Sequence, residues 1–421
     1  MIKKGTGTKV AASIFAAAMG MCGAMPAMAS PNYTPVKGGD MYFGKYLIMD
    51  QEANVPPVTF TYTIAAGTAQ TYNLGNRKFE VLAGVTPENV KFSNTPEATF
   101  TVGQQTFTTP QTGTNIKDTA NAAVVDQVEL TTGQKYARAE VKVDFSGVSF
   151  DEPGVYRYKL SETQSPASYV GIKNDEATDR IIDVYVTDNN GALEIAGYVM
   201  HSTSDDITMS QTNGTDGTNP AGKSKGYNNN YITHDLTFSK SVSGNQASKD
   251  KYFKFDVVIT GALPGTKFDV SGITGSNPTA DATVGTNSAT LPAYRGQSNP
   301  TTLEAGADGS VTQSFYLSHG QSLTINGIPD TVKYSVTESK EDYKPAVTIT
   351  GDTEATQAEA DTTLKVDDTQ SGITADTTDA FVNTREGIVP TGIIMTVAPY
   401  ATVVLIGGVG ATLMMRKKDE E

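Results

Sequence analysis

The stretch LTFSKSV, residues 236–242, alternates apolar and polar side chains from one residue to the next. Residues two apart lie on the same face of a β-strand, so this pattern predicts a strand with Leu236, Phe238 and Val242 on its buried face. Similar alternation, interrupted by turn sequences such as DNNG at 188–191, fills most of the chain between its two ends. The sequence therefore predicts an all-β protein, most simply one built from β-sandwiches.

The same alternation places a lysine on a buried face twice. Lys240 lies on the apolar face of residues 236–242, and Lys45 lies on the apolar face of MYFGKYL, residues 41–47. A single lysine at such a position is most often near a strand end, where its ammonium group extends to solvent. Two lysines in matching strands instead indicate a repeated and buried feature.

Two other strands place a glutamate on the apolar face, and two place an asparagine there. These residues are Glu162 in YRYKLSE (156–162), Glu338 in VKYSVTE (332–338), Asn229 in YNNNY (227–231) and Asn383 in FVNT (381–384). The order lysine, glutamate, asparagine thus occurs twice, and a Phe-rich strand follows each lysine, at 58–64 and at 253–259. This repetition indicates two copies of one domain plan. In the first copy, the neighbouring Asn228 and Asn230 are alternatives to Asn229.

A buried lysine, glutamate and asparagine can react with one another. Burial disfavours charged groups, so it favours the neutral lysine amine and the protonated glutamic acid. The amine can attack the asparagine carboxamide while the acid polarises the amide oxygen and transfers protons to the departing ammonia. The sequence therefore predicts self-formed isopeptide bonds, Lys45 to Asn229 and Lys240 to Asn383, with Glu162 and Glu338 as the proton-transferring acids.

Residues 1–29 have the pattern of a secretory signal peptide. Lysines precede an apolar, Ala-rich run, and AMA at 27–29 is a small-x-small cleavage site. Cleavage between Ala29 and Ser30 removes Cys22, the only cysteine, so the exported chain cannot form a disulfide. An isopeptide bond that closes a loop of more than about 100 residues stabilises a domain by about 4 to 5 kcal/mol, as a long-loop disulfide does.

The C-terminus carries a second targeting signal. Residues 393–415 form an apolar run long enough to span a bilayer, and a short charged tail follows. The simplest interpretation of this run is a permanent single-pass anchor. The preceding IVPTG sequence, however, makes it resemble the sorting signal of Gram-positive sortase substrates. Cleavage between Thr391 and Gly392 would pass the Thr391 carbonyl group to the sortase cysteine and then to an amine. The motif residues are Ile388, Val389, Pro390, Thr391 and Gly392; the common signal has proline in the place of Val389, and this variant resembles the signals of pilin-type sortases.

Three stretches resemble the backbone pilins of the streptococcal FctA/T-antigen family. They are FSGVSFDEPGVYRYKLSE at 145–162, residues 236–259 and the junction 383–392. The resemblance implies two tandem immunoglobulin-like β-sandwiches of the collagen-adhesin B type, between a signal peptide and a C-terminal transmembrane sorting helix. It also implies a Lys–Asn bond assisted by a glutamate in each sandwich, on the six residues named above.

The resemblance also implies domain boundaries and a site for the next subunit. In pilins of the streptococcal type, the lysine that receives the next subunit lies shortly before the last strand of the first domain. Lys223 and Lys225 lie in that region, where they can equally be solvated loop lysines. The predicted segments are a signal peptide at 1–29, isopeptide sandwiches at 30–231 and 232–386, and a sorting signal at 387–421.

Composition excludes several classes of function. The formal net charge of −14 disfavours a nucleic-acid partner. Three histidines and one cysteine leave little material for a metal site or a Cys–His dyad, and the histidines are scattered in polar contexts. We therefore expect neither a cofactor, nor a metal, nor an enzyme that acts on external substrates.

Two functions remain for the chain as a whole. The first is the structural subunit of a covalent pilus on the surface of a Gram-positive cell, and the alternative is a monomeric, wall-anchored adhesin on the same scaffold. The expected partners are a pilin-type sortase and a housekeeping sortase, further copies of the chain, minor or tip pilins and, indirectly, peptidoglycan. The acidic, Thr-rich stretches at 275–309 and 351–380 are expected to be long loops or poorly paired edge strands.

Overall fold

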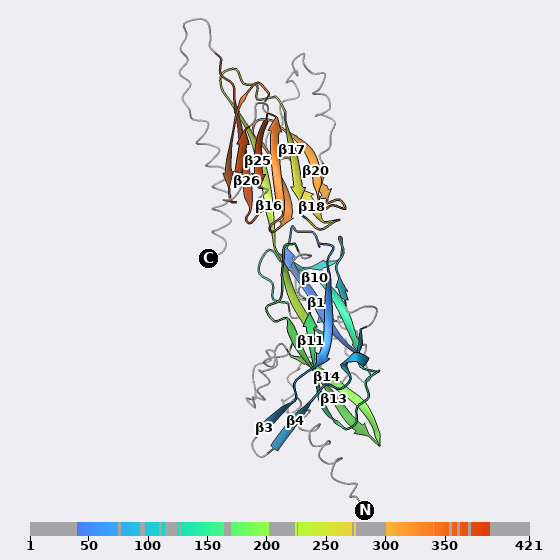
Figure 1. The fold of residues 1–421 in the computed structure, drawn as a ribbon. Helices are drawn as coiled ribbons and strands as arrows, with labels where there is room; N and C mark the ends of the chain where they lie inside the picture. The colour runs from blue at the N-terminus through green and yellow to red at the C-terminus, as the bar shows by residue number, and fades with distance from the viewer. Residues whose placement is uncertain are drawn as a thin grey trace, which may run out of the picture.

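The computed structural model describes residues 40–387, apart from 75–76, 93–96, 109–111, 114–123, 126–127, 164–169, 202–223, 225, 272, 275–299, 340, 353–355, 360–362 and 369–371. The predicted signal peptide, and the predicted sorting signal beyond Gly387, therefore lie outside the described residues. Within the described ranges, no helix is long and apolar enough to cross a membrane. Figure 1 shows two β-structures that lie end to end.

The first structure consists of two packed sheets. One orders β12 (Ile172–Lys173), β15 (Gly226–Tyr231), β1 (Asp40–Asp50), β10 (Gln134–Asp144) and β5 (Lys91–Phe92), with β7 (Thr106–Phe107) also paired to β10. The other orders β14 (Ala192–His201), β13 (Asp179–Asn189), β11 (Gly154–Glu162), β2 (Thr59–Ala66) and β6 (Glu97–Thr99), with β4 (Arg77–Ala83) paired to β11 and β3 (Gln70–Leu74) paired to β4. Short elements complete it: η1 (Pro87–Asn89), β8 (Thr112–Gly113) and β9 (Val124–Val125).

The second structure repeats this plan. One sheet orders β19 (Thr302–Glu304), β18 (Lys267–Val270), β21 (Gln321–Pro329), β16 (Thr233–Ser243), β26 (Thr377–Thr384) and β23 (Lys344–Thr350). The other orders β20 (Val311–Leu317), β17 (Phe253–Thr260), β22 (Lys333–Ser339), β25 (Thr363–Asp368) and β24 (Thr356–Glu359).

Each pair of sheets encloses its own hydrophobic core. Aromatic side chains from facing sheets meet there, such as Phe43 and Tyr62 in the first core and Phe238 and Phe255 in the second. In β16 the buried and partly exposed residues alternate as the sequence pattern predicts, and Lys240 lies among the buried ones. The predicted all-β class and the tandem sandwich architecture are thus confirmed.

The two sandwiches are joined by a very short connection. Only Ile232 separates β15 from β16, and its backbone is bonded on both sides: its N–H donates to the Gly171 carbonyl (2.8 Å) and its carbonyl accepts from the Asp330 N–H (3.0 Å). Gly171 has a φ of +71°, and a Cβ atom at this position would lie 2.9 Å from Pro329. Glycine is therefore required at this junction both by conformation and by space.

Candidate functional site

Parallel strand pairing brings each predicted lysine beside its predicted asparagine. In β1 and β15, which run parallel, Lys45 is opposite Tyr227 and Asn229 lies two residues further along. In β16 and β26, also parallel, Lys240 is opposite Phe381 and Asn383 again lies two residues further along. Since residues two apart share a face, each lysine and asparagine are diagonal neighbours on the buried side of one sheet.

The glutamates come from the facing sheets. Glu162 in β11 is opposite Tyr62 in β2, and Glu338 in β22 is opposite Phe255 in β17. The six predicted side chains are all buried, none being more than 3% exposed. We call Lys45, Glu162 and Asn229 the first cluster, and Lys240, Glu338 and Asn383 the second cluster.

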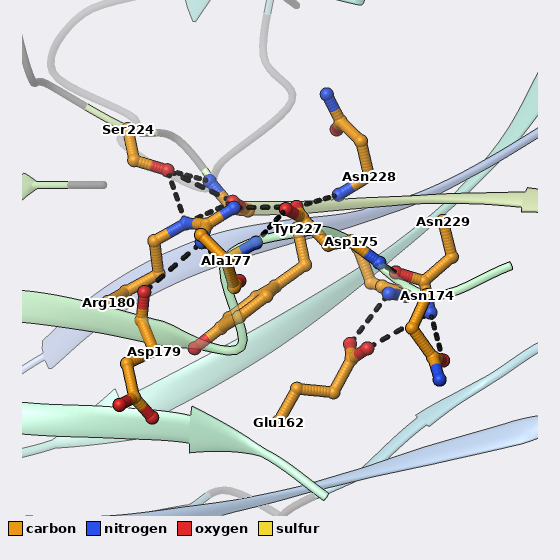
Figure 2. Close-up of polar contacts among 12 residues, drawn as sticks. Glu162, Asn174, Asp175, Ala177, Asp179, Arg180, Ser224, Tyr227, Asn228 and Asn229 are labelled. Atoms are coloured by element: carbon orange, nitrogen blue, oxygen red, sulfur yellow. Dashed lines mark hydrogen bonds and ion pairs between the residues drawn. The ribbon is translucent and has the colours of Figure 1, made fainter. Parts of the chain in front are cut away.

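In the first cluster, Glu162 accepts three hydrogen bonds. Its Oε2 accepts from Lys45 Nζ at 2.6 Å and from the Tyr62 hydroxyl at 3.1 Å. Its Oε1 accepts from Asn229 Nδ2 at 3.0 Å, a contact drawn in Figure 2. The glutamate thus contacts both the nitrogen that would attack and the nitrogen that would leave.

The second cluster has the same core geometry with fewer polar neighbours. Lys240 Nζ lies 2.5 Å from Glu338 Oε1, which also accepts from Asn383 Nδ2 at 3.1 Å. Phe255 takes the place that Tyr62 has in the first cluster, so the extra hydroxyl donor is missing. In both clusters the ammonium nitrogen lies over a phenylalanine ring; these contacts are Lys45 over Phe60 at 4.2 Å and Lys240 over Phe253 at 4.4 Å.

Burial shifts the pKa values of both lysines and of one glutamate. Desolvation lowers the pKa of Lys45 and of Lys240 to about 8, although the neighbouring glutamate acts in the opposite direction. Burial also raises the pKa of Glu338, against the effect of Lys240. These shifts make a neutral amine more accessible in both clusters, and a protonated acid more accessible in the second.

The structure also distinguishes among the three consecutive asparagines of β15. Asn229 is fully buried and contacts Glu162, whereas Asn228 is exposed and Asn230 is partly exposed. The choice of Asn229 by strand parity therefore agrees with the geometry. Its participation in a bond is a proposal, made below.

A network around the first cluster was not foreseen from the sequence. Arg180 donates to Asp175 Oδ2 (2.6 Å), to the Gly226 carbonyl (3.0 Å) and to the Ser224 hydroxyl (3.0 Å), and its guanidinium lies 4.4 Å from the Tyr227 ring. Figure 2 shows this network beside Asn229 and Glu162. Parity offered a signal, because in DRIIDVYV Arg180 shares a face with isoleucine and valine residues.

A second buried ion pair lies elsewhere in the first sandwich. The Arg157 guanidinium donates twice to Asp183, from Nε and from Nη2, each at 2.8 Å, and its Nη1 donates to Gln70 at 2.9 Å. Burial raises the pKa of Asp183, but the hydrogen bonds and charges of Arg157 and His201 together outweigh burial and lower it overall. The ion pair links β11 to β13, and the Gln70 contact links β11 to β3.

Several predicted sites lie outside the described residues. They are the signal cleavage site at Ala29 and Ser30, the lysines Lys223 and Lys225, and the sorting motif Ile388, Val389, Pro390, Thr391 and Gly392. Among the residues that are described, no group of three or more His, Cys, Asp or Glu side chains is arranged to hold a metal ion.

Comparison with known proteins agrees with this geometry. A family model described as "Spy0128-like isopeptide containing domain" (FctA) matches residues 81–231, and a "domain of unknown function" (DUF7601) matches residues 234–385. The chain is 26% identical over 337 residues to a pilin of Streptococcus pyogenes serotype M1. The aligned region covers 79% of this chain and 87% of the relative. The chain belongs to the streptococcal T-antigen type of backbone pilins.

Other relatives of this pilin come from the same organism. The pilus tip adhesin Cpa of Streptococcus pyogenes is 31% identical over 163 residues, which is 38% of this chain and 18% of the adhesin. Two solved major pilins of Streptococcus pyogenes superpose with TM-scores of 0.47 and 0.49, at 21% and 20% identity, over 84% of this chain and 100% and 99% of theirs. As a pilin, the chain is a subunit of a cell-surface pilus.

Proposed function

We propose that this pilin is the covalently polymerised shaft subunit of its pilus, and that each of its two domains, 30–231 and 232–386, forms one internal Lys–Asn isopeptide bond. The observation that carries the internal bonds is the recurrence of one arrangement in two sandwiches. In each, a buried lysine and asparagine lie two register positions apart on parallel neighbours, with a glutamate from the facing sheet touching both.

The proposed reaction joins the lysine amine to the asparagine side chain. The neutral Nζ attacks Cγ of the carboxamide, the Nζ–Cγ bond forms and the Cγ–Nδ2 bond breaks. The glutamate takes a proton from Nζ and gives one to Nδ2, so that ammonia leaves and the glutamate is regenerated. Glu162 and Glu338 are placed for this transfer because each contacts both nitrogens.

The bonds are placed where they would carry tension. Because β1 and β15 run parallel, the chain enters one end of the sandwich along β1 and leaves the other end along β15. Axial tension therefore shears these two strands against each other, and β16 and β26 are loaded in the same way in the second sandwich. A covalent bond between the two strands of each pair would pass the force directly and bypass the strands that lie between them in the sequence.

Mass spectrometry tests the internal bonds directly. We expect the exported chain, residues 30–391, to weigh about 34 Da less than its sequence, because each bond releases one ammonia of about 17 Da. In Glu162→Ala and in Glu338→Ala, the deficit from the variant's own sequence mass should fall to about 17 Da, because each substitution removes one proton-transferring acid. Asn228→Ala, a change of the exposed neighbour of Asn229, is the control and should keep both bonds. A full-mass parent chain would refute the internal bonds.

The pH dependence of bond formation follows from the lysines. With a pKa of about 8 in place of 10.5, about a tenth of each amine is neutral at pH 7, about 300 times more than for an ordinary lysine. The rate should therefore rise about tenfold per pH unit below about pH 8 and then level off. At the second cluster the rate should also fall as Glu338 loses its proton, at a pH above the ordinary range of a glutamate pKa. The measurement is the rate in newly synthesised chain between pH 6 and 10; a flat profile would contradict it.

Polymerisation is proposed to use the sorting signal. A sortase of the pilin type would cleave between Thr391 and Gly392 and join Thr391 to a lysine of the next copy, with Lys223 and Lys225 as the proposed acceptors. We expect cell-wall extracts boiled in detergent to show a ladder at multiples of the subunit mass. Thr391→Ala, or Lys223→Ala with Lys225→Ala, should abolish it, whereas Lys159→Ala, an exposed control, should not. A single band from the parent chain would favour the monomeric, wall-anchored adhesin.

A further inference from the structure

The two clusters differ at the oxygen of the asparagine side chain. Asn229 Oδ1 accepts a hydrogen bond of 2.9 Å from the backbone N–H of Asp175. Asn383 Oδ1 is buried and has no hydrogen-bond partner among the described residues. The first cluster therefore holds its carboxamide by the oxygen, and the second does not.

This hydrogen bond also settles which way the Asn229 side chain points. A backbone N–H can only donate, so the atom facing it must be the carbonyl oxygen. The amide nitrogen then faces two acceptors, Glu162 Oε1 at 3.0 Å and Asn174 Oδ1 at 3.3 Å. Both ends of the carboxamide are thus held, with the leaving nitrogen directed toward the proton-transferring glutamate.

The Asp175 carboxylate holds its own backbone in place. Its Oδ1 accepts from the Ala177 N–H at 3.0 Å, and its Oδ2 accepts from the Asn228 N–H at 2.9 Å and from Arg180 Nη2 at 2.6 Å. Figure 2 shows Asp175 between Arg180 and Asn229. Three donors on one carboxylate fasten the segment before β13 to β15, next to the asparagine.

We propose that the backbone N–H of Asp175 is the oxyanion donor of the first cluster, and that the Asp175 carboxylate, paired with Arg180, is the positioning group that aims it. This inference rests on the proposed isopeptide reaction. When Lys45 Nζ adds to Cγ of Asn229, negative charge develops on Oδ1, where the N–H already points. A preorganised donor at that atom stabilises the transition state more than the ground state.

Among the described residues no donor faces the Asn383 oxygen, so in the second cluster we assign the polarisation of that oxygen to a protonated Glu338. As the structure stands, the Asn383 amide donates from Nδ2 to Glu338 Oε1 at 3.1 Å; a protonated Glu338 would donate to Oδ1 after a half turn of this amide. The raised pKa of Glu338 fits this role. The same reaction is thus assigned two ways of activating the amide, and the second cluster serves as an internal reference for the first.

Electrostatics alone predicts the opposite effect of removing Asp175. The charged groups acting on Lys45 are Glu162, Asp175 and Arg180, and the negative charge of Asp175 raises the Lys45 pKa. Without that charge, more of the amine would be neutral at pH 7 and the bond would form faster. Loss of an aimed oxyanion donor would make it form more slowly. The direction of the rate change therefore separates the two roles.

The test compares Asp175→Ala with Asp188→Ala in the full chain. Asp188 also accepts a backbone N–H, from Gly191 at 2.6 Å, but in the turn at the far end of β13. Newly synthesised chain is sampled over time between pH 6 and 9, and the cross-linked tryptic peptides of each cluster are counted. We expect Asp175→Ala to slow the Lys45–Asn229 bond by tenfold or more, toward the factor of about 100 to 1,000 that one oxyanion donor supplies. The second cluster and Asp188→Ala should keep the parent rates.

Other outcomes are equally decisive. An unchanged or faster first bond in Asp175→Ala would overturn the proposal, and absence of both bonds in the parent chain would instead overturn the proposed reaction. Melting is compared between Lys45→Ala and Lys45→Ala with Asp175→Ala, two chains that cannot form the first bond. Similar melting supports the positioning role, whereas loss of the folded domain would assign Asp175 to folding alone. If Asp175→Ala does not fold, the rate of the Lys45–Asn229 bond is measured in Asp175→Asn, which keeps an acceptor oxygen but loses the charge paired with Arg180. A slower bond then supports the proposal, and an unchanged or faster bond overturns it.

Discussion

Asn229→Ala and Asn383→Ala together lower the free energy of unfolding by about 10 kcal/mol, about 5 kcal/mol in each domain. This is the loop-closure entropy that a cross-link removes from an unfolded chain when the closed loop exceeds about 100 residues. The midpoint of thermal unfolding should fall by roughly 10 to 20 °C per domain. Each single variant should destabilise mainly its own domain, because each sandwich has its own cluster of buried core residues.

Calorimetry of the parent, the two single variants and the double variant measures this effect. Asn228→Ala changes the same residue type one position away at an exposed site, so its melting should match that of the parent. The effect of Asn383→Ala should fall on the melting of the second sandwich. Unchanged melting of that sandwich would mean that no covalent bond stabilises it.

Arg157→Ala lowers the free energy of unfolding by about 3 to 5 kcal/mol, because it leaves the Asp183 carboxylate buried without its main partner. The side chains of this pair are only 1% and 4% exposed. Lys159→Ala, two residues along the same strand, is the matched control. The Lys159–Asp179 pair is 3.3 Å long and about half exposed, so its loss costs about 1 kcal/mol or less.

Urea unfolding at several pH values tests this assignment further. Against the effect of burial, Arg157 together with His201 holds the Asp183 pKa below its ordinary value. The stabilisation is therefore present above the unfolded pKa of the carboxyl group, about 3.9, and is lost as the pH falls through the lower folded value. The difference in the free energy of unfolding between Arg157→Ala and the parent should therefore become smaller in acid. An equal loss in Arg157→Ala and Lys159→Ala would show that burial does not strengthen the pair.

Strand parity identified the six buried residues because it needs only local information. A strand alternates its faces whatever its neighbours are, so Lys45 and Glu162 could be assigned to a core before any pairing was known. The Asn229 assignment depended on the same rule, since Asn228 and Asn230 have the opposite parity. The family resemblance then pointed to the same six positions.

Elements that depend on distant partners were predicted less well. The Thr-rich stretch 351–380 was expected to be loop or poorly paired edge, yet β25 within it pairs with β22 on one side and β24 on the other. Val366 of β25 is fully buried. Local composition does not reveal which strand will cover a given edge.

By itself, the sequence determined the β class, the duplication and the buried faces, because apolar and polar side chains alternate between neighbouring residues of a strand. Only the tertiary structure decided that each asparagine lies two register positions past the residue opposite its lysine, and that the glutamate reaches both from the facing sheet. It alone placed the Asp175 N–H on the Asn229 oxygen, across 54 residues of chain. Register and loop position arise from contacts between segments far apart in sequence, and no local pattern carries that information.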